Sequence, residues 1–269
     1  MISVQTARPH PRLEPFIRSY VYRKTGATDT AVIEPVVARL GAMLEFLFRR
    51  PYEIPLLGTT HTLVCPRVAI IGPVTERRVQ LVIRDQVEAL TVLFKPLGFF
   101  ALFGIPTSLI TSMGLEAHSI LGPAVSALNE QLENSSSFSE RVHMLNLFLC
   151  DCLDRRPPPE RLSHGFETFI AAATPLTVAE FARVAGLSPR QLERKALEHC
   201  GVPPKVLGRI ARYQRALRLK TATSLSWTDV AYRTNYHDQM HLVRDFHAFT
   251  GESPNRALSQ ISPDHLISL

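Results

Sequence analysis

The sequence contains few cysteines, 4 among 269 residues, and no two of them have the Cys-x-x-Cys spacing of a redox or zinc motif. A disulfide framework is therefore excluded, and the composition favours the reducing cytoplasm over secretion. Cys150 and Cys152 lie close together in the chain. We interpret them as two small buried apolar residues on or near a helix, because free cysteine is often buried.

No segment has the length and hydrophobicity of a membrane span or a signal peptide. The amino terminus, MISVQTARPHPRLEPF, lacks the apolar core of a signal peptide. The most hydrophobic run extends from Ala89 to Pro106, but Lys95 and Pro96 interrupt it, so it is predicted to form a core strand and a turn. The sequence therefore predicts no membrane partner.

Motifs of enzymatic chemistry are also absent. The sequence has no serine or cysteine nucleophile motif, no P-loop and no dinucleotide-binding fingerprint. The histidines of the first half show no tight ligand spacing; they are His10, His61, His118 and His143. The sequence therefore predicts no enzyme, no cofactor and no metal site.

Positive charge is in excess and is concentrated in one region. The formal net charge is +6 and the isoelectric point is about 9.4, while 45% of the residues are hydrophobic, which is typical of a globular protein with a core. Between residues 186 and 220, nine lysines and arginines oppose two glutamates, so this stretch alone carries +7. Such a run is commonly a solvated helix face, but it also fits a polyanionic partner.

Residues 177–200 have the pattern of two short helices joined by a tight turn. Thr177 and Glu180 fit a capping box at a helix start, and Gly186 tolerates the positive φ that ends the helix. Ser188, followed by Pro189 at the first helical position, predicts the start of a second helix. Two helices joined by a short glycine-containing turn form a helix-turn-helix unit.

A second copy of this pattern spans residues 226–254. Asn235 takes the place of Gly186, and asparagine is the usual non-glycine residue in the left-handed conformation. Asp238 is predicted to cap the next helix. Its apolar stripe is formed by Leu242, Phe246 and Phe249. The segment GESP then ends the helix with glycine and proline, as GVPP does in the first copy.

The region from about Thr174 to Leu258 resembles the DNA-binding domain of the AraC family of bacterial transcription regulators. The resemblance rests on LSPRQLERKALEHCGVPPK, IARYQRALRLK and DQMHLVRDFHAFTGESP. It implies two helix-turn-helix units, at about 177–200 and 227–250, joined by a long helix at about 204–221. Two positions depart from the family pattern: Asn235 stands for the usual glycine, and Ala196 stands for the usual large aromatic residue. The second departure leaves Leu192 or Leu197 to fill the core of the first unit.

The first half of the chain has the pattern of an all-β domain. From Thr30 to Phe94, short apolar runs rich in β-branched residues alternate with turn residues; the runs are AVIEPVVA, MLEFLF, TLVCPRVAIIG, VQLVI and LTVLF. Their spacing predicts a sheet folded on itself, as a sandwich or a barrel. The resemblance to the AraC family implies a cupin-like β-barrel here that binds a small-molecule effector.

Helical periodicity follows, from about Thr107 to Arg156. One apolar stripe is formed by Ile120, Ala124, Ala127, Leu128 and Leu132, and another by Val142, Leu145, Leu149 and Cys152. Two uses of these helices stay open: packing against the β domain, or pairing with a second subunit in a homodimer.

The segment RRPPPE, residues 155–160, has the composition of a linker, because three prolines stop a helix and stiffen the chain. The predicted fold is therefore α+β with two domains. An effector-sensing or dimerisation domain spans residues 1–156, with β-barrel or sandwich and trailing helices, and an all-α DNA-binding domain spans residues 161–269.

The second helix of each unit is expected to enter the major groove of double-stranded DNA, with its first two turns facing base edges. The predicted base-contacting residues are Arg190, Glu193 and Arg194 in the first unit, and Gln239, Met240, His241 and Arg244 in the second. Arginine can bond guanine, glutamine can bond adenine, and glutamate can accept from cytosine. As an alternative, Arg194 and Arg244 could instead pair with acids such as Glu198 and Asp245.

Phosphate contacts are predicted for Ser188, Lys205, Arg209 and Arg212. The connecting helix would hold the two recognition helices about one turn of DNA apart, roughly 34 Å, so that one chain reads an asymmetric site. RNA polymerase is a further partner for such a regulator, and the expected location is the cytoplasm.

Three other interpretations apply to parts of the sequence. His237 and His241 have the spacing of two zinc ligands on a helix, but Asp238 starts the helix between them and no third ligand lies nearby in the sequence. The amino-terminal domain could serve only for dimerisation. It could also be a cupin-type enzyme fused to a DNA-binding domain.

Overall fold

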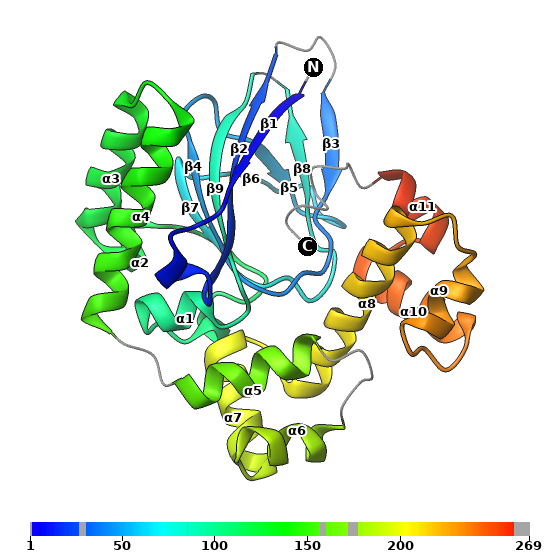
Figure 1. Cartoon of the computed structure of the whole chain (residues 1–269). Helices are drawn as coiled ribbons and strands as arrows, with labels where there is room; N and C mark the ends of the chain where they lie inside the picture. Colours follow the sequence, from blue (N-terminus) through cyan, green and yellow to red (C-terminus); the bar gives the residue numbers. More distant parts are fainter. Residues whose placement is uncertain (1, 27–30, 85, 157–159, 172–176, 261–269) are drawn as a thin grey trace.

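The computed structural model describes residues 2–26, 31–84, 86–156, 160–171 and 177–260. Figure 1 shows a β-rich body with helices on one side, and a helical body that extends below and beside it. The ten strands are β1 Ile2–Ala7, β2 Ile17–Thr25, β3 Val32–Pro35, β4 Met43–Leu47, β5 Glu53–Pro55, β6 Thr62–Val64, β7 Val68–Ile71, β8 Gln80–Ile83, β9 Glu88–Phe94 and β10 Gly114–Glu116.

The strands form two antiparallel sheets. A six-stranded sheet has the order β1-β2-β9-β4-β7-β10, and a four-stranded sheet has the order β3-β8-β5-β6. β9 lies inside the larger sheet, where Val92 pairs with Tyr20 of β2 and with Leu44 of β4. Every residue of β9 is buried, including the polar Glu88 and Thr91, which explains why its sequence is mostly apolar rather than alternating.

The two sheets face each other as a sandwich. Small residues of the six-stranded sheet, such as Ala69 and Ala89, share a buried cluster with Leu81 and Ile83 of the smaller sheet. Among the described residues, no ladder between named strands joins the two sheets. The predicted sandwich or barrel is therefore confirmed in its sandwich form.

Three helices after the sandwich cover the outer face of the six-stranded sheet: α2 His118–Leu121, α3 Pro123–Asn134 and α4 Phe138–Arg155. Leu128 of α3 and Leu145 of α4 belong to the same hydrophobic core as Leu44 of β4. Arg141 attaches α4 to the sheet, since its Nη1 lies 3.2 Å from Oε1 of Glu88. Packing within the domain is thus one established use of these helices.

Three details differ from the sequence-based predictions. Val125 is buried on α3, whereas Ala124 and Ala127 are exposed, so the inner face of this helix is rotated from the predicted stripe. The segment after β9 continues into a short helix, α1 Gly98–Phe103, because Phe99 and Leu102 bury themselves at the edge of the core. Cys150 and Cys152 are on α4 as expected, but only half-buried.

The rest of the chain is helical: α5 Glu160–Ala171, α6 Val178–Ala185, α7 Pro189–Cys200, α8 Pro204–Ala222, α9 Trp227–Arg233, α10 Gln239–Thr250 and α11 Pro254–Gln260. α4 ends at Arg155 and α5 begins at Glu160, so helices flank the proposed linker. Its three prolines, 157–159, lie outside the described residues, and the domain boundary stays a prediction. None of the described helices is both long and apolar enough to cross a membrane.

Candidate nucleic-acid interface

The first helix-turn-helix unit consists of α6 and α7, and local sequence explains both of its helix starts. The Thr177 side chain accepts from the backbone N–H of Glu180, whose carboxylate accepts in return from the N–H of Thr177, 2.8 Å away. Ser188 and Gln191 form the same reciprocal pair at the start of α7. Gly186 ends α6 with φ 66°, in the left-handed region.

The second unit consists of α9 and α10 and follows the same plan. The Ser226 hydroxyl caps α9 by accepting from the N–H of Asp229, and Asp238 caps α10 by accepting from the N–H of His241. Asn235 has φ 58° and thus takes the left-handed position that Gly186 takes in the first unit. The Asp238 cap and the Asn235 turn predicted from the sequence are confirmed, and the Ser226 cap adds to them.

Aromatic residues of α5 and α6 fill the core of the first unit beside Ala196. Phe169 stacks on Phe181 with ring centroids 4.1 Å apart, and Phe166 meets Phe181 edge to face at 4.9 Å. Leu192 is fully buried with Ala196, whereas Leu197 is partly exposed. Leu192, not Leu197, therefore compensates for the small side chain at position 196.

The predicted base-contacting residues of α7 are Arg190, Glu193 and Arg194, and all three are exposed. Glu198, the acid that could have paired with Arg194, is held instead by Lys195, with Nζ 2.9 Å from Oε2. Among the described residues, Arg194 therefore has no ion pair. Its guanidinium stays available to a ligand in solution.

On α10, the four predicted base-contacting side chains have different surroundings. Met240 and Arg244 are exposed, and Gln239 accepts a hydrogen bond from the hydroxyl of Thr228, 2.8 Å away. His241 is half-buried, and its Nε2 lies 3.2 Å from Nη2 of Arg212. Burial lowers the pKa of His241, with the positive charge of Arg212 adding to the effect, which favours the neutral ring with Nε2 as the acceptor.

A buried carboxylate connects α10 to the connecting helix α8. Arg209 donates to Oδ1 of Asp245 from Nε at 3.1 Å and from Nη2 at 2.7 Å, and Nη2 of Arg212 lies 3.2 Å from Oδ2. The Asp245 side chain is 3% exposed, while those of Arg209 and Arg212 are 38% and 16% exposed. The guanidinium of Arg212 also lies over the ring of Tyr236, 4.3 Å from its centroid.

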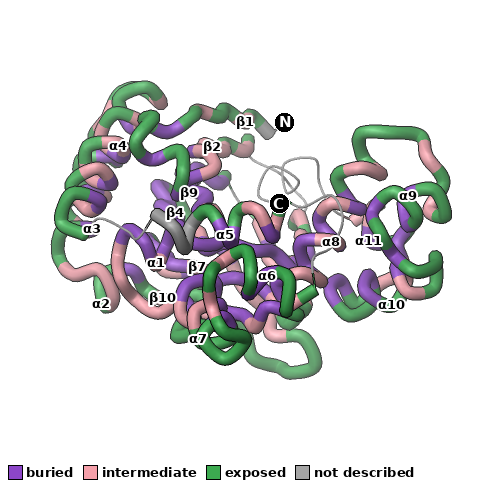
Figure 2. Tube along the Cα trace, turned by 60° about the horizontal axis from the view of Figure 1, so that its bottom comes forward, coloured by how far each residue is buried: buried purple, intermediate pink, exposed green. Residues whose placement is uncertain are grey.

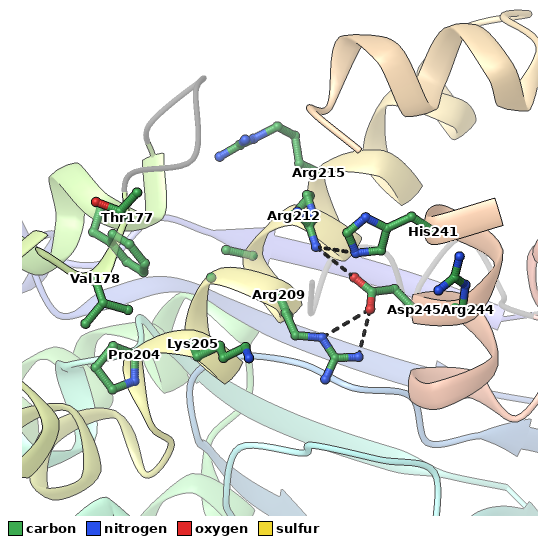
Figure 3. A pocket seen from close by; sticks show the side chains of 13 residues that line it. Thr177, Val178, Pro204, Lys205, Arg209, Arg212, Arg215, His241, Arg244 and Asp245 are labelled. Carbon is green, nitrogen blue, oxygen red and sulfur yellow. Dashed lines mark hydrogen bonds and ion pairs between the residues drawn. The ribbon is translucent and has the colours of Figure 1, made fainter. Parts of the chain in front are cut away.

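The two units enclose a groove of about 650 Å³ that follows α8 (Figure 3). Cations of the connecting helix and of the second unit line it: Lys205, Arg209, Arg212 and Arg215 of α8, and Arg244 of α10. Asp245 is the single carboxylate in the lining. Such a surface attracts phosphate, since a backbone anion can contact several cations at once.

Three of the four predicted phosphate contacts, Lys205, Arg209 and Arg212, line this groove. Lys205 is exposed and carries no other role in the described structure, whereas Arg209 and Arg212 are oriented by Asp245. The Ser188 hydroxyl is used as a cap, though it remains exposed at the start of α7. The sequence analysis considered Asp245 only as a partner of Arg244, whereas the structure pairs it with Arg209 and Arg212. Arg215 belongs to the basic stretch but was not assigned to a site; its helical spacing of three from Arg212 is the signal that could have indicated it.

Zinc binding at His237 and His241 has no support in this geometry. His237 is exposed beside Asp238, while the ring of His241 faces Arg212. No group of three or more potential ligands that could hold a metal occurs in the described parts of the chain.

Comparisons with known proteins agree with this architecture. A family described as a helix-turn-helix domain matches residues 181–260. The HTH-type transcriptional regulator GlxA of Rhizobium meliloti (strain 1021) is 33% identical over 84 residues, which cover 31% of this chain and 26% of that protein. Residues 181–260 therefore carry a helix-turn-helix domain of the AraC type.

The match to GlxA spans about a quarter of that regulator's length. The amino-terminal part of the chain matches, at residues 5–116, a family described as a domain of unknown function (DUF6597). Among solved structures, ToxT from Vibrio cholerae O395 covers 97% of the chain and is itself covered to 99%, with 11% identity and a TM-score of 0.49. An AraC-type regulator from Chromobacterium violaceum is 24% identical over 38% of the chain and 91% of its own, with a TM-score of 0.35.

Proposed function

We propose that this chain is a transcription regulator of the AraC family that recognises a specific DNA sequence with α7 and α10 together. One observation carries the proposal: the helix α8, which joins the two units, lines a groove with four cations, and the first turns of α7 and α10 are exposed. Helices of this type place their first turns against base edges, and the groove between them would receive the phosphate backbone. The proposed location is the cytoplasm, where DNA is accessible.

The proposed roles divide between reading and positioning. Arg190, Glu193 and Arg194 would read one groove segment, and Gln239, Met240, His241 and Arg244 the next. Lys205, Arg209 and Arg212 would contact phosphate from α8, with Ser188 at the start of α7. His241 would read bases in its neutral form, because Arg212 already occupies Nε2 as a donor.

We further propose that the sandwich receives a small-molecule effector, and its interior offers polar groups for one. Glu45 is buried between the sheets, where it accepts from the hydroxyl of Thr91 at 3.1 Å. Arg39 is equally buried, and its Nη2 has no hydrogen-bond partner. Burial lowers the pKa of Arg39 to about 10 and raises the pKa of Glu45. Buried charged groups that lack full pairing are typical of ligand sites.

Selection of bound duplexes from a random DNA pool tests the main proposal, with the full chain at moderate salt and titration against salt afterwards. Enrichment of two sequence blocks about one helical turn apart is the expected result. Salt-dependent binding without any enriched sequence would contradict it and leave a nonspecific basic protein.

Effector control is tested by screening small molecules for a shift in thermal unfolding and then measuring operator binding with each hit. A true effector should change the operator affinity of the unsubstituted chain but not that of Arg39→Met. Arg84→Met, which changes an exposed arginine just after β8, should keep the response. Hits that act equally on all three proteins would refute the assigned interior site. RNA polymerase and a second copy of the chain are further proposed partners, to be tested by co-purification and by mass in solution.

A further inference from the structure

The carboxy-terminal end of α7 is attached to the β-rich domain, not only to its own unit. Thr107, in the short 3-10 helix Thr107–Leu109, donates from Oγ1 to the carbonyl of His199 at 2.8 Å. Thr111 donates from Oγ1 to the carbonyl of Gly201, also at 2.8 Å. The last carbonyls of a helix have no partner within it, so the other domain here supplies donors for the end of a recognition helix.

Close packing accompanies these two hydrogen bonds. The ring of His199 lies against that of Phe100 of α1, with centroids 3.9 Å apart. A Cβ atom added at Gly201 would come within 2.3 Å of Oγ1 of Thr111. No side chain larger than hydrogen fits between the end of α7 and the threonine, and the contact therefore sets the position of the helix end closely.

The carboxy-terminal end of α10 is attached to a different part of the same domain. The backbone N–H of Ala38 donates to the carbonyl of Phe249 at 3.2 Å. Arg77 donates from Nη1 to the carbonyl of Thr250 at 3.2 Å and lies 3.7 Å from Oε1 of Glu252. Ala38 also shares a hydrophobic core with Phe249.

Both recognition helices are thus held at equivalent ends, from two separate points of the β-rich domain. α8 already packs against both units, and Asp245 ties α10 to it. The attachments at the two far ends add restraints from outside the helical domain, so that neither unit can shift along α8 without breaking contacts with the β-rich domain. Figure 1 shows α7 below the sandwich and α10 beside it, on either side of α8.

We infer that the β-rich domain positions α7 and α10 relative to each other, and that Thr107, Thr111 and Arg77 are positioning residues for the reading of DNA. Their attachments set the separation of the two groove segments that one chain can read. This inference rests on the proposed function. It adds that the sandwich itself determines which spacing of the two sequence blocks is accepted.

The test uses the full chain and the selected operator with one or two base pairs inserted or removed between its two blocks. Each base pair turns the second block by about one tenth of a helical turn. The unsubstituted protein should lose roughly tenfold or more in affinity for such shifted sites, comparable to one or two mismatched base pairs. The variant Thr107→Val/Thr111→Val/Arg77→Ala should lose less than about threefold, because its units can adjust.

The matched control is Thr62→Val/Arg78→Ala, which changes an exposed threonine of β6 and an exposed arginine that pairs with the exposed Glu76 of the same domain. Its affinity should depend on the spacing between the two sequence blocks in the same way as the affinity of the unsubstituted protein does; this dependence is called the spacing profile below. A purely structural role for the three residues would lower affinity for every spacing alike. A triple variant with an unchanged profile, or an unsubstituted protein that tolerates every spacing, would overturn the inference.

Two further measurements keep the outcome decisive. If the triple variant does not fold, Thr111→Val and Arg77→Ala are measured singly. Each single variant should lose less affinity for the shifted sites than the unsubstituted protein does, though more than the triple variant would. If the unsubstituted protein selects no sequence, the proposed function fails on its own. Amide hydrogen exchange then decides whether the attachments exist, since residues 197–201 and 247–251 should exchange faster in the triple variant. Unchanged exchange there would refute the positioning role.

Discussion

Nη2 of Arg209 lies 2.7 Å from Oδ1 of Asp245, and the carboxylate is buried while the guanidinium still reaches the groove. The pair joins α8 to the recognition helix α10. The same arginine is proposed to contact phosphate, so one side chain would both hold the protein together and bind DNA.

Replacing Asp245 with asparagine should lower the free energy of unfolding by about 1–3 kcal/mol. The loss arises because Arg209 and Arg212 keep their charges beside a neutral amide, while their partial exposure limits the cost. Urea unfolding followed by circular dichroism measures the change. Asp151→Asn, which alters an exposed pair with Arg155 on α4, should leave the unfolding midpoint almost unchanged. Equal effects of the two substitutions would contradict the role given to the buried carboxylate.

Arg244→Ala and Arg209→Ala should affect DNA binding in different ways. Loss of Arg244, exposed on α10, should cost about 1–3 kcal/mol at the specific site and relax preference there, because a base contact is removed. Loss of Arg209 should weaken all sequences alike and reduce the salt dependence by about one unit of slope. Affinities on operator and random DNA over a salt series distinguish the two, with Arg84→Ala as the control. Equal losses for Arg244→Ala on both DNAs would make this residue a phosphate contact.

Gly186→Ala should lower stability by about 1–2 kcal/mol through backbone strain alone. Gly186 has φ 66°, and an added Cβ would meet no atom within 4 Å. Gly114→Ala is the matched control, since its Cβ also enters open space but no positive φ is involved. Thermal unfolding should separate the two variants. A comparable loss in both would show that strain at the turn is not the cause.

Acidification should destabilise the protein through His199. Burial lowers its pKa to about 4, against about 6.5 in the unfolded chain. The unfolded state takes up the proton at a higher pH than the folded state does. The free energy of unfolding is therefore unaffected by His199 above about pH 6.5 and decreases as the pH falls towards 4. The decrease amounts to about 2 kcal/mol at pH 5. His199→Phe, which keeps a ring against Phe100, should remove this part of the pH dependence. Identical pH profiles of unfolding for the two proteins would refute the assignment.

The helical half of the fold could be predicted closely because its signals are local. Thr177, Ser188 and Asp238 each accept a hydrogen bond from the N–H three residues on, so a cap can be recognised from a few adjacent letters. Asn235 in the left-handed turn is predictable for the same reason. The exposed position of Arg194 also follows from helical periodicity, but its proposed contact with a base stays a prediction.

The β-rich half was predictable as strands but not as sheets. The runs that became β4 and β9 are clear in the sequence, yet nothing local indicates that β4 lies between β9 and β7. The helix Gly98–Phe103 was missed since its aromatic residues resemble a strand, and burial against the sandwich decided its conformation. The sequence placed Ala124 on the buried stripe of α3, whereas the structure buries its neighbour Val125. An apolar stripe on a helix is several residues wide, and packing against the neighbouring sheet determines which of these residues are buried.

Sequence alone was sufficient for the two helix-turn-helix units, their AraC-type pattern and the surface expected to face DNA, because caps, turns and helical periods depend on residues within about four positions of each other. Tertiary structure decided the contacts that organise this surface. Asp245 meets Arg209 from 36 positions away, and Thr107 reaches the end of α7 from 92 positions away. Such contacts depend on how whole elements pack, and packing is a property of the complete core rather than of any segment.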